Sequence, residues 1–386
     1  MYVGQSIKRR EDDRFLTGSS KYVDDVFLSE NIAHAAYVRS PHPHAKITSI
    51  ATERAQAMPG VLAVLTGKDW TDAGYGEAES VWPVKDMSGE PSRTVNRPFL
   101  AIDGVVRYVG ECVAMVVAED RYSALDAAEA VEIEYEALPA NVVTAKALDA
   151  DIPLVHPELG TNMVLETTHG DKDATDAAFA KAAHVTECVV PTNRVTASSI
   201  EPRSYLGHYD VQKDYYTLWA ATQSPHLERM HLAVSLQIPE HKCRVIAPDV
   251  GGGFGMKLYH YPEEPTVLWA SKIVGRPVRW TGTRSEALVS DTHARDHYTV
   301  GRMAFDADGK ILAMSFETLA AFGAYESQFQ ASITNAYHFC LLSCGYDIAA
   351  IHTHVKAVYT HTTPVDAYRG AGRPEAVYQV ERLIEN

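Results

Sequence analysis

Cysteine is scarce and scattered in this chain. Its 386 residues contain five cysteines, at positions 112, 188, 243, 340 and 344. An odd number of widely spaced cysteines does not indicate a disulfide framework, and this favours a reducing compartment. Only Cys340 and Cys344 are close in sequence, whereas an iron–sulfur cluster commonly needs three or four grouped thiolates. If electrons pass through this protein, we expect the metal relay to lie on another chain.

Positive charge and long apolar runs are also lacking. Lys and Arg total 35 against 50 Asp and Glu, which gives a net charge of −15. Such a surface repels phosphate backbones and anionic lipids, so nucleic acids and membranes are not expected as main partners. No stretch of about 18 uninterrupted apolar residues occurs, and charges fill the N-terminal segment where a signal peptide needs an apolar run. We therefore expect a cytoplasmic protein with no membrane span.

The residues that are present indicate an ordinary globular protein. The composition is 46% hydrophobic and 22% charged, and a chain of 386 residues suggests two or three domains. Apolar runs with strand character alternate with helical segments on both sides of a linker-like stretch, which runs from Pro139 to about Asp173. This alternation predicts an α/β (α+β) fold. The predicted parts are an N-terminal strap (1–20), a first α/β domain (20–140), a linker (140–165) and a second α/β region (165–386).

The expected elements follow from apolar patterning, capping residues and turn residues. In the first domain we expect strands at 32–38 and 61–66, a helix at 52–58, a long loop over 70–97, two strand-like halves in 105–118, a helix from about 121 to 130 and a strand at 131–135. In the second region we expect helices at 176–183, 225–236 and 264–274, strands at 184–190, 205–209, 215–220, 245–250, 278–281 and 355–360, a hairpin over 298–316 and a C-terminal helix from 375.

The strongest local signal is a glycine-rich loop. The apolar run Val245-Ile246-Ala247-Pro248-Asp249-Val250 leads into Gly251-Gly252-Gly253-Phe254-Gly255. Glycine permits positive φ and close backbone approach, so this loop can aim several N–H groups at an anion or a cofactor oxygen. No Gly-Lys-Ser/Thr follows and the spacing is not Gly-x-Gly-x-x-Gly, so the loop is not a standard phosphate loop. The alternative interpretation is a tight turn without function.

Two further segments could carry chemistry. Asp366 to Pro374 sets Arg369 and Arg373 among glycines after an expected strand, and the planar guanidinium suits phosphate or a polar heterocycle. A surface turn with solvated arginines explains the same residues. The run Thr222-Gln223-Ser224-Pro225-His226 follows a strand and begins a helix, and ligands in open α/β sheets bind at such strand ends. Ser-Pro is also a routine helix entry.

Other patterns are weaker. His338, Cys340, Cys344, His352, His354 and His361 offer zinc-type donors, but their spacing fits no standard zinc site. Asp306-Ala307-Asp308-Gly309 resembles the start of a calcium loop, but the later liganding Glu is missing and a hairpin turn explains it.

Taken together, three segments in this order resemble one known family. Thr-Gln-Ser-Pro-His at 222–226, Gly-Gly-Gly-Phe-Gly at 251–255 and Ala-Tyr-Arg-Gly-Ala-Gly-Arg-Pro-Glu at 367–375 are similar to segments of the molybdopterin-binding subunits of the xanthine dehydrogenase and aldehyde oxidase family, which includes the large subunit of aerobic carbon monoxide dehydrogenase. Arg39-Ser40-Pro41-His42-Pro43-His44 and Tyr108-Val109-Gly110-Glu111 resemble the hammerhead domain of that family. The resemblance covers essentially the whole chain and corresponds to the N-terminal half of such a subunit.

The resemblance implies a molybdopterin site with no direct protein ligand to the metal. Gln223 matches a glutamine that hydrogen-bonds an oxygen on molybdenum, Phe254 and Gly255 match a pair whose backbone faces the metal's ligands, and Arg369 matches an arginine whose segment closes over the cofactor. Because the pterin dithiolene supplies sulfur ligands, the protein needs only to orient and polarise them. The implied cofactor-binding residues are Gln223, Gly252, Gly253, Phe254, Gly255, Arg369, Gly370 and Ala371.

The resemblance also implies an activity and partners. Such enzymes insert water-derived oxygen into a C–H bond and pass electrons to an iron–sulfur subunit and an FAD subunit. The cofactor is molybdopterin, with a cytosine dinucleotide as one candidate form. The general-base glutamate of the family lies near the end of a chain about twice this length, so no catalytic residue is assigned here, and we expect no activity without the C-terminal half.

Departures from the family pattern narrow the range of expected substrates. Carbon monoxide dehydrogenases carry a cysteine where this chain has Gly370, so carbon monoxide chemistry is not expected. Purine oxidases carry a glutamate that Met256-Lys257-Leu258 lacks, and a phenylalanine at the position of Ala371. An aldehyde or an N-heterocycle is therefore the expected substrate. Two other hypotheses remain: a scaffold or assembly protein with this fold and no cofactor, and a nucleotide-binding oxidoreductase that uses the glycine loop.

Overall fold

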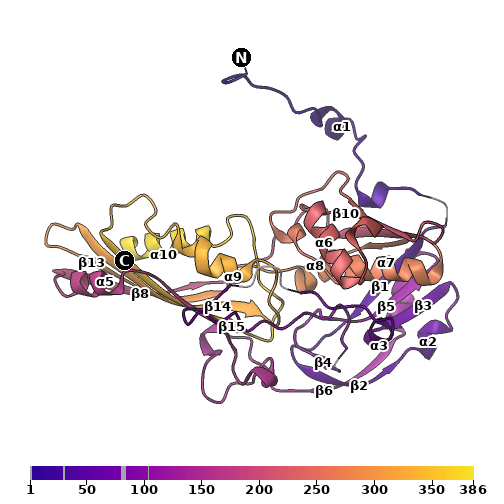
Figure 1. Cartoon of the computed structure of the whole chain (residues 1–386), viewed down its shortest axis with the longest axis horizontal. Helices are drawn as coiled ribbons and strands as arrows, with labels where there is room; N and C mark the ends of the chain where they lie inside the picture. Colours follow the sequence, from indigo (N-terminus) through magenta and orange to yellow (C-terminus); the bar gives the residue numbers. More distant parts are fainter. Residues whose placement is uncertain (1, 29–30, 80–83, 103) are drawn as a thin grey trace.

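The fold is built on two large sheets at opposite ends of the long axis of the molecule (Figure 1). A computed structural model of the chain describes residues 2–28, 31–79, 84–102 and 104–386. Part of the loop expected over 70–97 lies outside these residues. Within them, no helix combines the length and the apolar character that crossing a membrane requires. The mixed α/β fold class predicted from the sequence is confirmed.

The seven-stranded sheet joins strands that are far apart in the sequence. Strand β1 pairs in parallel with β12, with Ala33 opposite Val278, and antiparallel with β5. Strand β5 is buried along its whole length, as expected for the apolar run Cys-Val-Ala-Met-Val-Val-Ala on a central strand. In sheet order the strands are β11 (Cys243–Ile246), β10 (Tyr215–Ala220), β9 (Ser204–Asp210), β12 (Val278–Thr281), β1 (Ala33–Arg39), β5 (Cys112–Ala118) and β3 (Val61–Thr66).

Helices pack on this sheet at close range. A Cβ added at Gly207 of β9 would lie 2.8 Å from the backbone carbon of Val267, so glycine there lets helix α7 approach the sheet. The helix α6 predicted from Pro225 forms and begins with that proline at its first position. The helices that accompany this sheet are α2 (Glu53–Gln56), α3 (Gly67–Asp72), α4 (Arg121–Glu129), α6 (Pro225–Ser235), α7 (Glu263–Val274) and α8 (Arg284–Ser290).

The five-stranded sheet carries the C-terminal part of the chain. The predicted hairpin forms between β13 and β14, and Asp306 closes its turn by accepting hydrogen bonds from the N–H groups of Asp308 and Lys310. Helix α10 packs on this sheet through the cluster of Met303, Phe316 and Leu383 with their neighbours. In sheet order the strands are β7 (Met163–Gly170), β15 (Ala350–Tyr359), β14 (Ile311–Gly323), β13 (His297–Phe305) and β8 (His184–Thr192), and the helices beside them are α5 (Lys172–Phe179), α9 (Gln330–Ser332) and α10 (Arg373–Glu385).

A small three-stranded sheet completes the architecture, in the order β4 (Val105–Val106), β2 (Ala45–Ala51), β6 (Glu132–Ala137). Short 3-10 turns occupy Val23–Asp25, Thr144–Lys146, Pro157–Leu159, Glu240–Lys242 and Met256–Leu258, and a π-helical turn spans Ile333–Tyr337.

Several local predictions were wrong. Strand β2 directly follows the Pro-His-Pro-His stretch, where no strand was expected. Strand β7 lies inside the stretch interpreted as linker-like up to Asp173, and its pairing with β15 overrides a polar sequence. The helix expected at 176–183 begins earlier, because the Asp171 side chain caps it by accepting from the N–H of Ala174 at 2.9 Å. The strand expected at 245–250 ends at Ile246.

The N-terminal strap projects from the body of the molecule and includes helix α1 (Asp12–Leu16) (Figure 1). Its inner end is anchored beside the glycine loop, because Asp249 donates its N–H to the carbonyl of Lys21 and accepts from the N–H of Lys21, both at 3.0 Å. The guanidinium of Arg14 also pairs with the Asp249 carboxylate. The seven-stranded sheet contains strands from both sides of the predicted linker, and the boundaries at 20, 140 and 165 stay predictions.

Candidate functional site

The sheet topology places two of the three candidate segments at one edge. Strands β10 and β11 are parallel neighbours, so their carboxyl ends meet on the same side of the seven-stranded sheet. Gln223 follows β10, and the glycine loop follows β11. The third segment follows β15 of the other large sheet and leads into α10. A site made by all three therefore lies where the two sheets adjoin.

Gln223 is held by the residues around the glycine loop. Its backbone N–H donates to the carbonyl of Lys257 at 2.8 Å, and its side-chain Oε1 accepts from the N–H of Gly255 at 2.9 Å. Gln223 is exposed, and its Nε2 donates to no other group of the described chain. The carboxamide is thus fixed through its oxygen and leaves its nitrogen available as a donor.

Close contacts with neighbouring segments require glycine at two positions of the loop. A Cβ added at Gly253 would lie 2.3 Å from Oε1 of Gln223. Gly255 has a φ of 105°, and a Cβ added there would lie 2.6 Å from the carbonyl oxygen of Ala367. Side chains at these positions would push the loop away from Gln223 and from the third segment, so glycine is a packing requirement here.

The third segment is joined to the glycine loop through its backbone. The N–H of Arg369 donates to the carbonyl of Phe254 at 2.7 Å. On the other side, the carbonyl of Arg369 accepts from Nη2 of Arg295 at 2.9 Å. The guanidinium of Arg295 is neutralised by the buried carboxylate of Glu375 on α10, at 3.1 Å. The position of Arg369 is therefore fixed from both sides while its own side chain is exposed.

The structure brings together most of the residues singled out from the sequence. Gln223, Gly253, Phe254, Gly255 and Arg369 form a connected set of direct contacts. Gly252 lies against the Phe254 ring, because a Cβ added at Gly252 would lie 2.9 Å from that ring. Gly370 and Ala371 form hydrogen bonds within their own turn, with Arg373 and Tyr368, and in the described chain no hydrogen bond joins them to Gln223 or the glycine loop.

The connected set contains hydrogen-bond donors that no protein group of the described chain uses, beside the exposed side chains of Gln223, Phe254 and Arg369. Within the described ranges, the N–H groups of Gly252, Gly253 and Phe254 donate to no protein group, and the guanidinium of Arg369 has no ion pair. Phe254 is 41% exposed and has a φ of 56°, a left-handed conformation that is unusual for an aromatic residue. Such a surface can bind an anionic group or a group rich in acceptor atoms, with the Phe254 ring as an apolar wall.

An ion pair between Glu201 and Lys257, which was not predicted from the sequence, supports the glycine loop. Oε2 of Glu201 accepts from the N–H of Gly251 at 2.6 Å and from Nζ of Lys257 at 2.8 Å. The N–H of Glu201 donates to the carbonyl of Gly251 at 3.1 Å. Burial lowers the pKa of Lys257, and the Glu201 carboxylate opposes that effect. Lys257 is the second residue after the loop in sequence, but no local pattern links it to Glu201.

A second missed pair supports the third segment. The Tyr259 hydroxyl donates to Oδ1 of Asp366 at 2.9 Å and accepts from the N–H of Ala367 at 2.5 Å. The other carboxylate oxygen of Asp366 accepts from the N–H of Phe329 at 2.8 Å. Burial raises the pKa of Asp366 to about 6. Tyr259 therefore connects the chain that leaves the glycine loop to the start of the Arg369 segment.

Replacing Tyr259 by phenylalanine is expected to destabilise the chain by about 1–3 kcal/mol, because the Asp366 carboxylate and the Ala367 N–H lose a shared buried partner. Urea unfolding measures the change. Tyr209→Phe is the matched control, since its hydroxyl also bonds an aspartate, Asp214 at 2.8 Å, but at an exposed position. Equal effects of the two variants would contradict the supporting role of Tyr259.

The weaker zinc pattern is not assembled in the structure. His338 contacts Gln379, His361 accepts from the N–H of Asn141, and His354 lies between Glu166 and Glu317. Within the described residues, no metal-type grouping contains any of the residues from that pattern. A different grouping, of Glu228, His260 and Glu264, was not noticed in the sequence.

Comparison with family models assigns both parts of the chain. Residues 17–139 match the aldehyde oxidase and xanthine dehydrogenase a/b hammerhead domain, and residues 155–386 match the molybdopterin cofactor-binding domain.

Known proteins match over nearly the whole chain. The carbon monoxide dehydrogenase large chain of Afipia carboxidovorans is 37% identical, over 99% of this chain and 48% of its own length. The nicotinate dehydrogenase large molybdopterin subunit of Eubacterium barkeri is 31% identical, over 93% of this chain and 79% of its own length. The crystal structure of quinoline 2-oxidoreductase from Pseudomonas putida 86 superposes with a TM-score of 0.91 at 36% identity, over all of this chain and 48% of that chain. The chain thus spans about half the length of the first and third of these relatives.

Proposed function

The chain belongs to the family of molybdopterin-binding large subunits of the xanthine dehydrogenase and aldehyde oxidase type, and we propose that it forms one side of the molybdenum cofactor site of a hydroxylase. The family consists of molybdopterin oxidoreductases. The observation that carries the proposal is that Gln223, Phe254 and Arg369 meet around Gly255. Beside them, Nε2 of Gln223 and the N–H groups of Gly252 to Phe254 have no acceptor in the described chain.

The donor set fits such a cofactor. Gln223 offers Nε2, and the loop offers consecutive backbone N–H groups, all of which suit the oxygen and sulfur acceptors of a dithiolene-bound metal. No thiolate or imidazole is part of the connected set, which agrees with a metal whose ligands come from the cofactor. When bound, the cofactor would supply the transfer of a water-derived oxygen atom to the substrate and would accept the electrons that the oxidation releases.

The chain's own residues then act by positioning. Nε2 of Gln223 would hydrogen-bond an acceptor atom of the cofactor, since its Oε1 is already used by Gly255. The N–H groups of Gly252 to Phe254 would bind further acceptor atoms, and the Phe254 ring would exclude water from one side of the substrate. The Arg369 segment would cover the cofactor from the direction of α10. The roles of Gly370 and Ala371 in binding the cofactor are part of this proposal, through their place in that segment.

The reaction proposed is the insertion of water-derived oxygen into a C–H bond of an aldehyde or an N-heterocycle. Relatives named for nicotinate and quinoline, which are N-heterocycles, support this substrate class. The proposal includes the partners implied by the family resemblance: a C-terminal half with the general base, an iron–sulfur subunit and an FAD subunit. A cytosine dinucleotide form of the cofactor, dependence of activity on the C-terminal half and a cytoplasmic location also belong to it.

The scaffold hypothesis is less well supported. A protein that only holds partners together has no use for a carboxamide that is held by its oxygen and whose nitrogen has no acceptor in the described chain, or for a run of backbone amides without acceptors there. Metal analysis separates the two functions, because a scaffold complex would contain no molybdenum.

The proposal is tested by replacing Gln223 with alanine in the chain co-expressed with a complementary C-terminal half. A hydrogen bond to a charged group contributes about 1.5–3 kcal/mol, so the affinity for the cofactor should fall about ten- to hundredfold. Molybdenum and pterin per complex are measured after gel filtration. Gln212→Ala, at an exposed turn, is the control and should retain the cofactor. A wild-type complex without molybdenum, or a Gln223→Ala complex with the wild-type amount, would contradict the proposal.

A further inference from the structure

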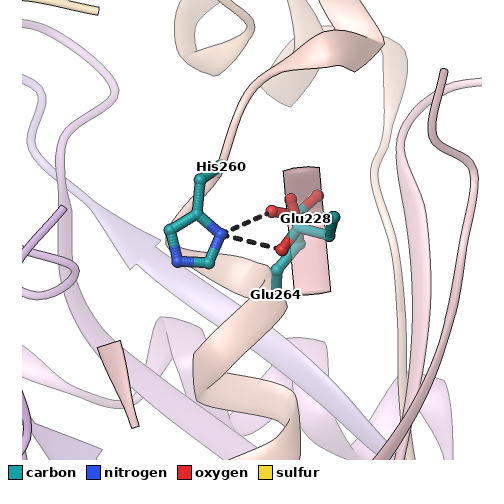
Figure 2. Close-up of side chains that lie close together, drawn as sticks. All are labelled: Glu228, His260 and Glu264. Atoms are coloured by element: carbon teal, nitrogen blue, oxygen red, sulfur yellow. Dashed lines mark hydrogen bonds and ion pairs between the residues drawn. The ribbon is translucent and has the colours of Figure 1, made fainter. Parts of the chain in front are cut away.

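A buried group of three side chains lies on the segments that follow Gln223 and the glycine loop in the chain. Figure 2 shows His260 with its Nδ1 directed toward two carboxylates, those of Glu228 and Glu264. The distances are 2.8 Å to Oε1 of Glu228 and 3.1 Å to Oε2 of Glu264, and one donor atom from each residue lies within 4.8 Å of the other two. Glu228 is on α6, Glu264 is on α7 and His260 is in the segment before α7. Two backbone segments, α6 and the stretch from His260 into α7, thus direct their donors to one point.

Apart from His260, no cationic side chain of the described chain pairs with the two carboxyl groups. All three side chains are 1% exposed, and no arginine or lysine of the described chain forms an ion pair with Glu228 or Glu264. The neighbouring residue Glu263 is different, because Arg203 and Arg39 pair with it at 2.5 and 2.8 Å. Among these buried glutamates of the described chain, arginine therefore neutralises Glu263 and neither Glu228 nor Glu264.

We propose that Glu228, His260 and Glu264 bind a divalent transition-metal cation, with zinc as the best-fitting ion. Zinc takes imidazole nitrogen and carboxylate oxygen at about 2.0–2.2 Å, so two donors on one ion stand roughly 3.0–3.5 Å apart, close to the spacing found here. Two carboxylates and a neutral imidazole balance the charge of one divalent ion. An oxygen of a bidentate carboxylate or a water molecule completes a tetrahedral site.

The surroundings hold His260 and Glu264 in place, as in known metal sites. Nε2 of His260 lies 2.8 Å from the Ser235 hydroxyl, which leaves Nδ1 free to face the ion when the Nε2 proton is donated to serine. The N–H of Tyr261 donates to Oε2 of Glu264 at 2.9 Å. The ring of His231 stacks on that of His260, with centroids 5.4 Å apart. The imidazole orientation is therefore fixed by a hydrogen bond and by stacking.

The site would serve the fold around the cofactor surface. Helix α6 begins directly after Gln223 and Ser224, and His260 lies in the stretch that leaves the glycine loop. An ion bound to both elements and to α7 would lock the two chain segments that hold Gln223 and Gly255 together. Its role is structural, because none of its ligands belongs to the surface that faces the cofactor.

Zinc binding by the purified chain tests the proposal. The chain is treated with chelator, dialysed against zinc chloride and analysed for metal, and its thermal unfolding is followed with and without zinc. We expect one zinc ion per chain and a rise in Tm of about 4 °C at saturating zinc. Glu264→Gln removes one ligand with little change of shape and should lose both effects, while circular dichroism confirms that it is folded.

The matched control is Glu317→Gln. Glu317 and Glu166 flank His354 at opposite ring nitrogens, at 2.8 and 2.7 Å, so the residue types are the same but a single ion cannot contact all three. This variant should bind zinc as the wild type does. A wild-type chain that takes up no zinc and shows no shift in Tm would overturn the proposal, and would mean that the carboxylates and His260 share protons instead. Equal zinc uptake by wild type and Glu264→Gln would overturn it as well.

Discussion

Replacing Gly255 by alanine should separate the segments of the proposed cofactor surface and reduce the molybdenum content of the assembled complex more than tenfold. The new Cβ would lie 2.6 Å from the carbonyl oxygen of Ala367 and 3.0 Å from its carbon, in a residue with a φ of 105°. Backbone strain of about 1–3 kcal/mol adds to an overpacking cost of about 1–3 kcal/mol. The loop can relieve both only by moving, which breaks the bond from the Gly255 N–H to Gln223.

Urea unfolding and metal analysis measure the two effects of this change. Gly345→Ala is the control, because a Cβ added there meets nothing within 4 Å and its φ is not in the left-handed region. The control should have wild-type stability and wild-type molybdenum. If Gly255→Ala behaves like the control, Gly255 is not the junction of the three segments.

Replacing Glu263 by glutamine is expected to destabilise the chain by about 3–5 kcal/mol. The carboxylate is fully buried and bonds Arg203 at 2.5 Å and Arg39 at 2.8 Å. Arg39 lies on β1, Arg203 lies just before β9 and Glu263 begins α7, so the two bonds connect α7 to the two strands that flank β12. Neutral glutamine leaves two buried guanidinium groups with less compensation.

The same carboxylate gives the stability a pH dependence. The arginines lower the pKa of Glu263 from 4.5 to about 2, despite its burial. Its contribution is therefore fully present above about pH 4.5 and is lost as the pH falls through about 2, by up to about 3 kcal/mol. The difference in stability between wild type and Glu263→Gln should shrink across this window.

Urea unfolding at pH 7 and at acid pH tests both the loss of stability in Glu263→Gln and its pH dependence. Glu240→Gln is the control, since the Glu240–Arg229 pair has a similar distance of 2.8 Å but both side chains are about half exposed. An exposed pair contributes about 0–1 kcal/mol. A Glu263→Gln variant that loses no more stability than Glu240→Gln would show that the buried pair does not hold the sheet together.

Local patterns predicted individual elements well where burial and propensity agree. Strand β5 is apolar throughout and helix α6 has proline at its start, and both form as expected. Strand β7 was missed because its sequence, Met-Val-Leu-Glu-Thr-Thr-His-Gly, becomes polar along its length, and only pairing with β15 makes it a strand. The parallel pairing of β1 with β12 joins residues about 245 positions apart, which no local pattern encodes.

In the candidate site, too, local features were predicted from the sequence and long-range contacts were not. Glycines and the exposed arginine were visible in the sequence because a glycine-rich stretch is unusual wherever it occurs. The supporting pairs were not visible, since Glu201 and Lys257, or Tyr259 and Asp366, are brought together only by the fold. The grouping of Glu228, His260 and Glu264 was missed for the same reason, because α6 and α7 become neighbours only in the folded chain.

Hydrogen–deuterium exchange of the assembled complex, compared with and without its molybdenum cofactor, tests the central claim most directly. Partner contacts are the same in both samples, so a difference reports the cofactor. Because the amides of Gly252, Gly253 and Phe254 have no protein acceptor in the described chain, we predict that peptides covering them become protected when the cofactor is bound. Unchanged exchange at these amides in a complex shown to contain molybdenum would contradict the account.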